Sequence, residues 1–265
     1  MFNKRSPIGI FDSGLGGLTV FKAVRRLMPS ENLIYFGDTA RVPYGTKSKE
    51  AVRAFSREIA ALLSARGVKL LIVACNTASS LALEEVRKAS KAPVIGVIGP
   101  GARAACAATA NNRVLVTGTA ATIASGAYGR ALKKIKPDVL VYEKACPLFV
   151  PLVEEGWCAK KVTELVAAEY LSPFKKNNFD TVILGCTHYP LLKKVIRRVL
   201  GRVNIVDSAE VTAEEARAGL AARGLLNPGG AGRAAFIASD APEKFRGLAL
   251  RLLGIRTGRV EVKRF

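Results

Sequence analysis

Two cysteines of the chain lie in matching sequence frames. Cys75 lies in residues 73–77 (VACNT) and Cys186 in residues 184–188 (LGCTH), and each ends an apolar run and precedes a polar pair. Close to half of the 265-residue chain separates them, so a duplicated fold could present both thiols to one cleft. A thiol with a pKa near 8.5 can be tuned to act as base or acid near neutral pH. Such a pair can remove a proton from one face of a carbon atom and deliver one to the other.

Short β-branched runs alternate with longer amphipathic stretches along the chain. Strands that are nearly continuous apolar runs and alternate with helices indicate parallel sheets covered on both faces, so the predicted fold class is α/β. The predicted strands are 8–11, 33–36, 70–74, 94–98, 114–117, 139–142, 181–184, 204–206 and 234–238. The predicted helices are 18–27, 50–65, 79–88, 121–134, 159–170, 191–199 and 213–223.

A sequence pattern that occurs twice along the chain predicts two similar halves. Residues 8–14 and 114–119 both read as a strand followed by a polar turn, and each precedes its cysteine by a similar distance. We therefore expect two similar α/β domains, each a mainly parallel sheet flanked by helices, with the active site in the cleft between them. The Gly- and Pro-rich residues 96–101 are the expected first crossover, and residues 206–208 the expected return. The predicted domains are 1–98 plus 207–265, which carries Asp12 and Cys75, and 99–206, which carries Glu154, Cys186 and His188.

Ligands of a parallel α/β sheet gather beyond the carboxyl ends of the strands. Residues 12–17 (DSGLGG) follow the first predicted strand but match neither GxGxxG nor a Walker A motif. Their glycines could bring backbone N–H groups at a helix N-terminus toward a carboxylate. A tight strand-to-helix turn capped by Ser13 or Asp12 is the alternative. The strand-end candidates are Asp12, Ser13, Asp38, Cys75, Asn76, Thr77, Thr119, Cys186, Thr187 and His188.

The remaining cysteines and the single histidine carry weaker signals. A lone free cysteine is commonly a small buried apolar residue, and Cys106, Cys146 and Cys158, which lack the repeated frame, are interpreted in that way. His188 is either a structural residue or a partner of Cys186, and its place at a strand end favours the second reading. Asp12 is the corresponding candidate at the other thiol.

The composition limits the classes of function. No apolar run approaches the ~18 residues that suggest a membrane span, and the N-terminus has no secretory pattern, so we expect a cytoplasmic protein without membrane contact. Five cysteines without a CxxC pair do not form a disulfide framework and disfavour a redox enzyme. With one histidine in the chain, no zinc site is expected.

The formal net charge of +20 first suggests nucleic acid as a partner. However, the basic residues are scattered in ones and twos, with no long run and no binding module with interleaved aromatic residues. We therefore expect no dedicated nucleic-acid site, and a basic surface would attract a small anionic substrate.

Six segments of the chain closely resemble the bacterial glutamate racemase family of the aspartate/glutamate racemase superfamily. They occur in the order of the family and cover the chain from about residue 8 to residue 210, and GDTARVPYG and GCTHYP are the most specific. The segments are 12–17 (DSGLGG), 37–45 (GDTARVPYG), 74–77 (ACNT), 118–122 (GTAAT), 151–154 (PLVE) and 185–190 (GCTHYP).

The resemblance implies an isomerase that interconverts L- and D-glutamate without a cofactor and supplies D-glutamate for peptidoglycan synthesis, cell wall biogenesis and cell shape. By that analogy, Cys75 and Cys186 are the acid/base thiols on opposite faces of the substrate α-carbon. Asp12 would assist Cys75, while His188 and Glu154 would assist Cys186. A homodimer is expected by analogy only. The implied substrate-binding residues are Asp12, Ser13, Tyr44, Gly45, Asn76, Thr77, Thr119, Thr122, Thr187 and His188.

Two other readings remain open on the sequence alone. One is a different racemase, isomerase or decarboxylase of the same two-cysteine superfamily, for example an enzyme that acts on aspartate. The other is a basic nucleic-acid-binding protein whose thiols are incidental.

Overall fold

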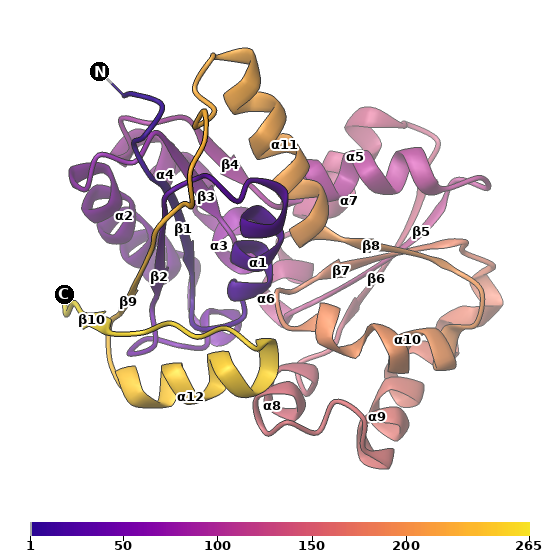
Figure 1. Cartoon of the computed structure of the whole chain (residues 1–265). Helices are drawn as coiled ribbons and strands as arrows, with labels where there is room; N and C mark the ends of the chain where they lie inside the picture. The colour runs from indigo at the N-terminus through magenta and orange to yellow at the C-terminus, as the bar shows by residue number, and fades with distance from the viewer. Residues whose placement is uncertain (1) are drawn as a thin grey trace.

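The computed structural model describes residues 2–265 and contains two parallel β-sheets (Figure 1). The larger sheet has the order β10-β9-β2-β1-β3-β4 and the smaller one the order β6-β5-β7-β8, and every strand pair is parallel. The predicted α/β class is confirmed. The strands are β1 (Ile8–Asp12), β2 (Leu33–Gly37), β3 (Leu70–Val73), β4 (Val94–Gly96), β5 (Arg113–Gly118), β6 (Leu140–Ala145), β7 (Thr181–Gly185), β8 (Asn204–Asp207), β9 (Ala234–Ala238) and β10 (Val260–Val262).

The two sheets share one strand order. Strands β1 to β4 lie side by side in the order β2-β1-β3-β4 in the larger sheet. Strands β5 to β8 lie in the equivalent order, β6-β5-β7-β8, in the smaller sheet. Cys75 follows β3 and Cys186 follows β7, so the two thiols occupy equivalent positions. Strands β9 and β10 extend the larger sheet beyond β2. The part of the molecule built on this sheet is called the larger half, and the part built on β5 to β8 the smaller half.

Helices cover both faces of each sheet, because alternate strand residues point to opposite sides. On the larger sheet, Ile8 and Ile10 pack with α1 and α11, whereas Phe11 packs with α2 and α4. On the smaller sheet, α8, α9 and α10 cover one face and α5 and α7 the other. The helices are α1 (Leu18–Leu27), α2 (Lys49–Ala65), α3 (Asn76–Leu81), α4 (Leu83–Ala89), α5 (Ile98–Ala108), α6 (Ala120–Ala124), α7 (Ala127–Ile135), α8 (Phe149–Glu154), α9 (Lys161–Leu171), α10 (Lys193–Leu200), α11 (Ser208–Ala222) and α12 (Pro242–Leu253).

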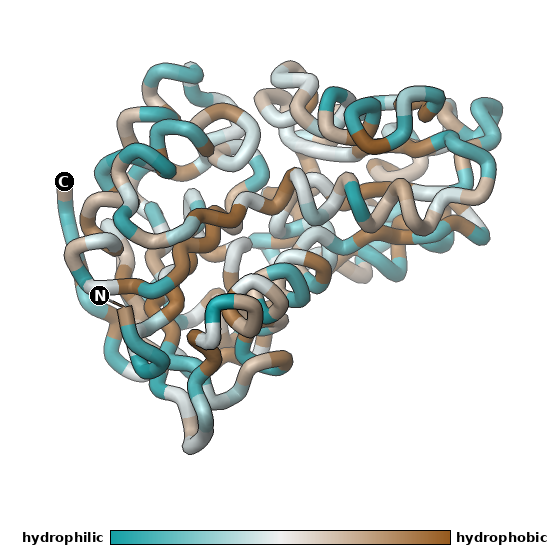
Figure 2. Tube along the Cα trace, turned by 90° about the horizontal axis from the view of Figure 1, so that it is seen from above, coloured by the Kyte–Doolittle hydropathy of each residue, from teal (hydrophilic) through white to brown (hydrophobic). Residues whose placement is uncertain are grey.

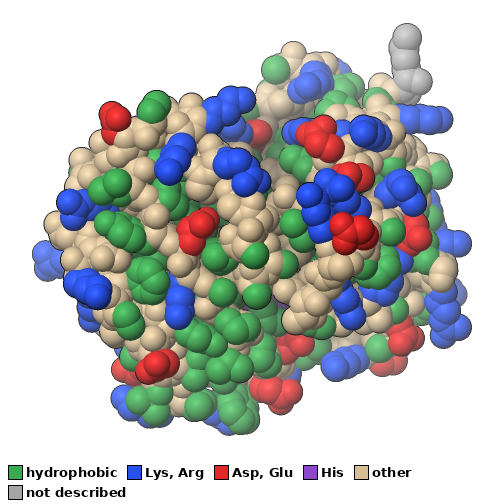
Figure 3. Space-filling view, turned by 180° about the vertical axis from the view of Figure 1, so that it is seen from behind, with side chains coloured by type: hydrophobic (Ala, Val, Ile, Leu, Met, Phe, Trp, Pro, Cys, Tyr) green, Lys and Arg blue, Asp and Glu red, His purple; other side chains and the backbone are tan. Residues whose placement is uncertain are grey.

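The hydropathy of the trace follows this layered arrangement. Seen from above, hydrophobic segments run through the interior, and hydrophilic residues lie on many of the outer turns (Figure 2). Figure 3 shows that Lys and Arg side chains are dispersed over the rear face, with acidic side chains between them. None of the helices in residues 2–265 is long and apolar enough to cross a membrane.

Several predicted element boundaries were wrong. The prediction continued a strand to Ile98, but β4 ends at Gly96 and α5 begins at Ile98, so the expected crossover turn is largely helical. Pro100 is tolerated there because the first helical turn does not need its missing N–H group. The predicted helix 121–134 is divided at Gly126, which has a φ of 60°, and the predicted helix 79–88 at Ala82.

Two further differences lie in the C-terminal quarter. The prediction began a helix at Ala213, but α11 begins at Ser208, because the Asp207 carboxylate accepts a hydrogen bond from Ala209 N and caps the helix. Helix α12 and the three-residue strand β10 were not predicted. Strand β10 completes the edge of the larger sheet next to β9.

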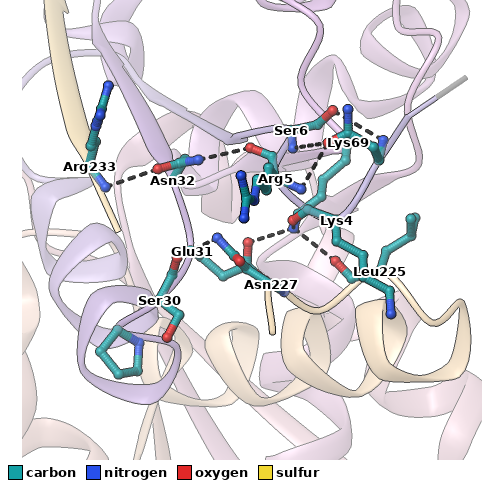
Figure 4. Close-up of polar contacts among 12 residues, drawn as sticks. Lys4, Arg5, Ser6, Ser30, Glu31, Asn32, Lys69, Leu225, Asn227 and Arg233 are labelled. Atoms are coloured by element: carbon teal, nitrogen blue, oxygen red, sulfur yellow. Dashed lines mark hydrogen bonds and ion pairs between the residues drawn. The ribbon is translucent and has the colours of Figure 1, made fainter. Parts of the chain in front are cut away.

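A buried ion pair joins three segments of the larger half (Figure 4). Lys69 Nζ lies 2.5 Å from Glu31 Oε2, and both side chains are buried. The ammonium group also donates to the carbonyl oxygens of Lys4 and Leu225, at 2.5 and 2.8 Å. Glu31 Oε1 accepts a hydrogen bond of 2.8 Å from Asn227 N. The pair therefore fastens the N-terminal segment and the loop after α11 to the start of β3.

Candidate active site

A cavity of about 140 Å³ lies where the carboxyl-terminal ends of the two sheets meet. It is lined from both halves of the chain, with Cys75 from the larger half and Cys186 from the smaller one. The strand-end rule thus identified residues that the fold brings together. The predicted site residues that line the cavity are Ser13, Tyr44, Gly45, Cys75, Asn76, Thr77, Thr119, Cys186, Thr187 and His188.

Cys75 occupies the N-cap position of α3, directly after β3. Its Sγ accepts a hydrogen bond from Ala78 N at 3.4 Å and donates one to Ser13 Oγ at 3.6 Å. Burial, with the nearby charge of Asp12 as a second cause, raises the pKa of the Cys75 thiol to about 12. The thiol of Cys75 is therefore neutral at physiological pH in the unliganded protein.

Asp12 lies behind the cavity wall at the end of β1. Its Oδ2 accepts from Gly14 N at 3.0 Å, and its Oδ1 accepts from Thr187 Oγ1 of the other half at 3.4 Å. Burial raises the pKa of the Asp12 carboxyl above its ordinary value, and the charge of His188 opposes that rise. The carboxyl group thus connects the glycine-rich turn after β1 with the segment that carries Cys186.

The glycine-rich turn after β1 allows the two halves to approach closely. A Cβ atom on Gly16 would lie 2.4 Å from Thr187 Oγ1 and 2.5 Å from His188 Nδ1. A Cβ atom on Gly17 would lie 2.4 Å from Asp12 Cβ. Neither position has room for a side chain, so both residues must be glycine. The turn leads directly into α1, which begins at Leu18.

Cys186 follows β7 and has His188 as its polar neighbour. Sγ of Cys186 lies 3.9 Å from His188 Nδ1, and Nε2 of the same ring lies 3.1 Å from Glu154 Oε1. Burial alone would lower the pKa of His188, but the hydrogen bonds with Cys186 and Glu154 raise it to about 10. The same hydrogen bond lowers the pKa of Glu154. The imidazole is therefore protonated at neutral pH, and Glu154 supports it from outside the cavity lining.

Three threonine hydroxyls from both halves form a cluster at the cavity. Thr77 Oγ1 lies 3.0 Å from Thr119 Oγ1 and 3.3 Å from Thr122 Oγ1, and the last two are 2.9 Å apart. Thr122 is buried behind the other two and does not line the cavity. Gly45 packs on this cluster, because a Cβ atom there would lie 2.9 Å from Thr119 Cβ.

Asp38, a strand-end candidate, fixes the loop that carries Tyr44 and Gly45. Its buried carboxylate accepts hydrogen bonds from Tyr44 Oη, from Ser239 Oγ at 2.8 Å and from Arg41 Nε at 2.7 Å. The Arg41 guanidinium lies over the ring of Phe265 at 4.7 Å. The C-terminal residue of the chain thus supports a wall of the cavity without touching it.

Sequence reasoning missed the apolar wall of the cavity. Apolar side chains carry no chemical signature, although two of them belong to the GDTARVPYG segment that the sequence singled out. The additional lining residues are Val42, Pro43, Thr46, Ala120, Pro147, Val150 and Pro151. Within residues 2–265, no three His, Cys, Asp or Glu side chains are grouped so that they could hold a metal ion.

Comparison with known proteins gives consistent matches over nearly the whole chain. The family model described as Asp/Glu/Hydantoin racemase matches residues 18–216. The glutamate racemase of Geobacter metallireducens is 52% identical over 255 residues, which are 96% of this chain and 94% of that protein. The glutamate racemase of Chlorobaculum tepidum is 51% identical over 260 residues, which are 97% of this chain and 96% of that protein.

Solved structures agree with these sequence matches. The crystal structure of glutamate racemase from Thermus thermophilus in complex with beta-chloro-D-alanine superimposes with a TM-score of 0.91 at 50% identity, over 99% of this chain and 98% of that one. Glutamate racemase from Francisella tularensis in complex with D-glutamate gives a TM-score of 0.93 at 39% identity, over 98% of each chain.

Proposed function

Because this chain belongs to the Asp/Glu/hydantoin racemase family, we propose that it interconverts L- and D-glutamate by proton transfer between two cysteines. The protein is a racemase, and the predicted resemblance is confirmed. One observation carries the mechanism: Cys75 and Cys186 follow equivalent strands of two equally ordered sheets and line the same cavity.

The polar lining suits an amino acid with two carboxylates. We assign the carboxylates and the ammonium group of glutamate to Ser13, Asn76, Thr77, Thr119 and Thr187, together with the backbone of residues 44–45. The proposal is supported by hydroxyl and amide groups from both halves that face the cavity. Thr122 acts through Thr77 and Thr119, whose hydroxyls it contacts.

The protonation states around the thiols favour one starting state. Cys75 is a neutral thiol, and the imidazolium of His188 next to Cys186 stabilises negative charge on that sulfur. In this state the Cys186 thiolate takes the α-proton of L-glutamate, and the Cys75 thiol delivers its proton to the opposite face. The products are D-glutamate, a Cys186 thiol and a Cys75 thiolate, and the reverse reaction begins from that state.

The pocket must lower the barrier to forming the carbanion. The α-proton of an amino acid is weakly acidic, so hydrogen bonds to the substrate carboxylate and a retained α-ammonium group have to stabilise the developing charge. These hydrogen bonds act in a cavity whose thiols and histidine are almost entirely buried. Preorganised donors of this kind are most effective where water is excluded.

The same proposal includes the cellular role and the division of the chain. D-glutamate is the form that peptidoglycan synthesis consumes, in the cytoplasm. Residues 1–98 plus 207–265 and residues 99–206 are proposed as the two domains. The division is supported by the two sheets, since β5 to β8 form the smaller sheet and the other six strands form the larger one.

Circular dichroism of glutamate solutions tests the function. Purified protein is added to L-glutamate, and separately to D-glutamate, without pyridoxal phosphate or added metal. Both signals should decay to zero, because the two enantiomers have equal free energy. Persistence of both signals with folded protein would overturn the proposal, and turnover of aspartate in place of glutamate would reassign the substrate.

A further inference from the structure

A tyrosine outside the cavity lining reaches from one half of the molecule to a residue beside the first thiol. Tyr128, in α7, is 1% exposed. Its phenol hydroxyl donates a hydrogen bond of 2.7 Å to Oδ1 of Asn76. Asn76 is the first residue of α3 and directly follows Cys75. The hydrogen bond therefore joins the smaller half to the segment of the larger half that carries a reactive sulfur.

The position of the tyrosine ring is fixed by two glycines. A Cβ atom on Gly101 would lie 3.2 Å from Cε1 of Tyr128, and a Cβ atom on Gly185 would lie 3.1 Å from Cε2. The ring thus packs closely against backbone at both edges, and Gly185 directly precedes Cys186. Because the ring has little room to move, its hydroxyl presents a fixed donor to Asn76.

The carboxamide of Asn76 is left with an unused donor. Asn76 is 2% exposed and lines the cavity, and its Nδ2 has no hydrogen-bond partner in the described part of the chain. A buried donor without a partner costs about 1–3 kcal/mol. This cost is offset when an acceptor enters the cavity, and the substrate carboxylate is the acceptor that the proposed function supplies.

We propose that Tyr128 is a positioning residue that fixes the Asn76 carboxamide so that Nδ2 faces a substrate carboxylate. This inference rests on the proposed function. Rotation of the carboxamide by half a turn would present Oδ1 to the cavity and take away the acceptor of the phenol proton. The repulsion between Oδ1 and the carboxylate would then weaken substrate binding. Tyr128 contacts neither the substrate nor the reacting atoms.

The test removes only the phenol oxygen. Tyr128→Phe in the full chain should raise KM for both enantiomers of glutamate about five- to tenfold, the effect of one lost hydrogen bond. We expect kcat to change less than twofold, because the thiols keep their positions. The loss in kcat/KM must be equal in both directions, since the equilibrium constant between enantiomers is one.

Two further variants separate positioning from a general loss of structure. Tyr142→Phe, a β6 residue outside the cavity lining, removes a phenol oxygen from the same half and should leave KM and kcat unchanged. In an Asn76→Ala background, Tyr128→Phe should add less than a twofold change, because the group that it positions is gone.

Two results would overturn the inference. One is a KM for Tyr128→Phe within twofold of the wild-type value. The other is that Tyr128→Phe raises KM by the same factor in the Asn76→Ala background as in the wild-type chain. The wild-type protein assayed in parallel reports separately on the proposed function. Absence of racemisation by the wild type would refute that function. The ratio of the KM of Tyr128→Phe to the wild-type KM tests only the positioning role of Tyr128.

Discussion

Nε2 of His188 lies 3.1 Å from Oε1 of Glu154, while Nδ1 of the same ring faces Sγ of Cys186 at 3.9 Å. The imidazole thus bridges a carboxylate and a reactive sulfur. This arrangement gives the ring a raised pKa of about 10. Because the chain contains one histidine, a single NMR resonance reports on this ring.

Replacing the carboxylate should lower the pKa of the ring. In Glu154→Gln the imidazolium loses its charged acceptor, so we expect the pKa of His188 to fall by at least one unit, and kcat to fall about tenfold as the thiolate loses its partner. An NMR titration of the histidine and racemisation kinetics measure the two effects. Glu155→Gln, on the adjacent residue, is the control. An unchanged titration curve for Glu154→Gln would contradict the bridge.

Both cysteines should be indispensable. Cys75→Ser and Cys186→Ser should each lower racemisation by at least about a thousandfold, because the serine hydroxyl is a far weaker acid than a thiol. Far-ultraviolet circular dichroism should show the same folded spectrum as the wild type. Cys158→Ser, which alters a cysteine outside the cavity, should retain full activity. Substantial turnover by either of the first two variants would reject the two-thiol mechanism.

Space at the glycine turn should be essential for activity. In Gly16→Ala the new Cβ atom would meet Thr187 and His188 at 2.4–2.5 Å, so these side chains must move away from the cavity. We expect at least a hundredfold loss of kcat/KM. Gly129→Ala, where the nearest atom lies at 3.7 Å, should be as active as the wild type and slightly more stable, because alanine favours the helix. A wild-type value of kcat/KM for Gly16→Ala would contradict the claim that the turn cannot accommodate a Cβ atom at residue 16.

The buried pair of Lys69 and Glu31 should stabilise the fold without affecting the chemistry. Lys69→Met leaves the Glu31 carboxylate buried without its partner, so the free energy of unfolding should fall by about 3–5 kcal/mol. Urea denaturation measures this change. Arg87→Ala, which breaks an exposed ion pair with Glu84, should cost less than about 1 kcal/mol. Equal effects of the two variants would exclude a special role for the buried pair.

The protein should lose stability at alkaline pH. The pKa of His188 is raised from 6.5 to about 10 and that of Cys75 from 9.0 to about 12. In both cases the folded state holds its proton more tightly than the unfolded state. The contribution of His188 is therefore complete below pH 6.5 and disappears as the pH rises through 10, with a loss on the order of 5 kcal/mol. Denaturation midpoints between pH 6 and pH 10 should decrease, and His188→Asn should flatten this decrease.

The sequence was most informative where a polar residue follows a buried strand. The frames around Cys75 and Cys186 placed both thiols at strand ends, and parallel sheets bring such ends together. Periodicity located nine of the ten strands but missed β10, which has three residues and lies at an edge. It predicted a strand up to Ile98 and no helix for α5 (Ile98–Ala108), because Gly99 and Pro100 indicate a turn.

The contacts between the halves were beyond prediction from the sequence. Tyr128 reads as an ordinary core residue of an amphipathic helix, and its hydrogen bond to Asn76 depends on how two separately formed sheets are placed. The same holds for Gly16, whose requirement for space arises from His188, far along the chain. Short-range patterns contain no information about such placements.

Hydrogen exchange with solvent tests the two-thiol mechanism most directly. L-glutamate is converted in deuterium oxide to a small extent, the enantiomers are separated, and the deuterium at Cα of each is measured by mass spectrometry. We predict that the D-glutamate formed carries one deuterium, because Cys75 delivers a solvent-derived proton, while the recovered L-glutamate retains protium. Recovered L-glutamate that gains deuterium as fast as D-glutamate forms would indicate a single base acting on both faces and would contradict the account.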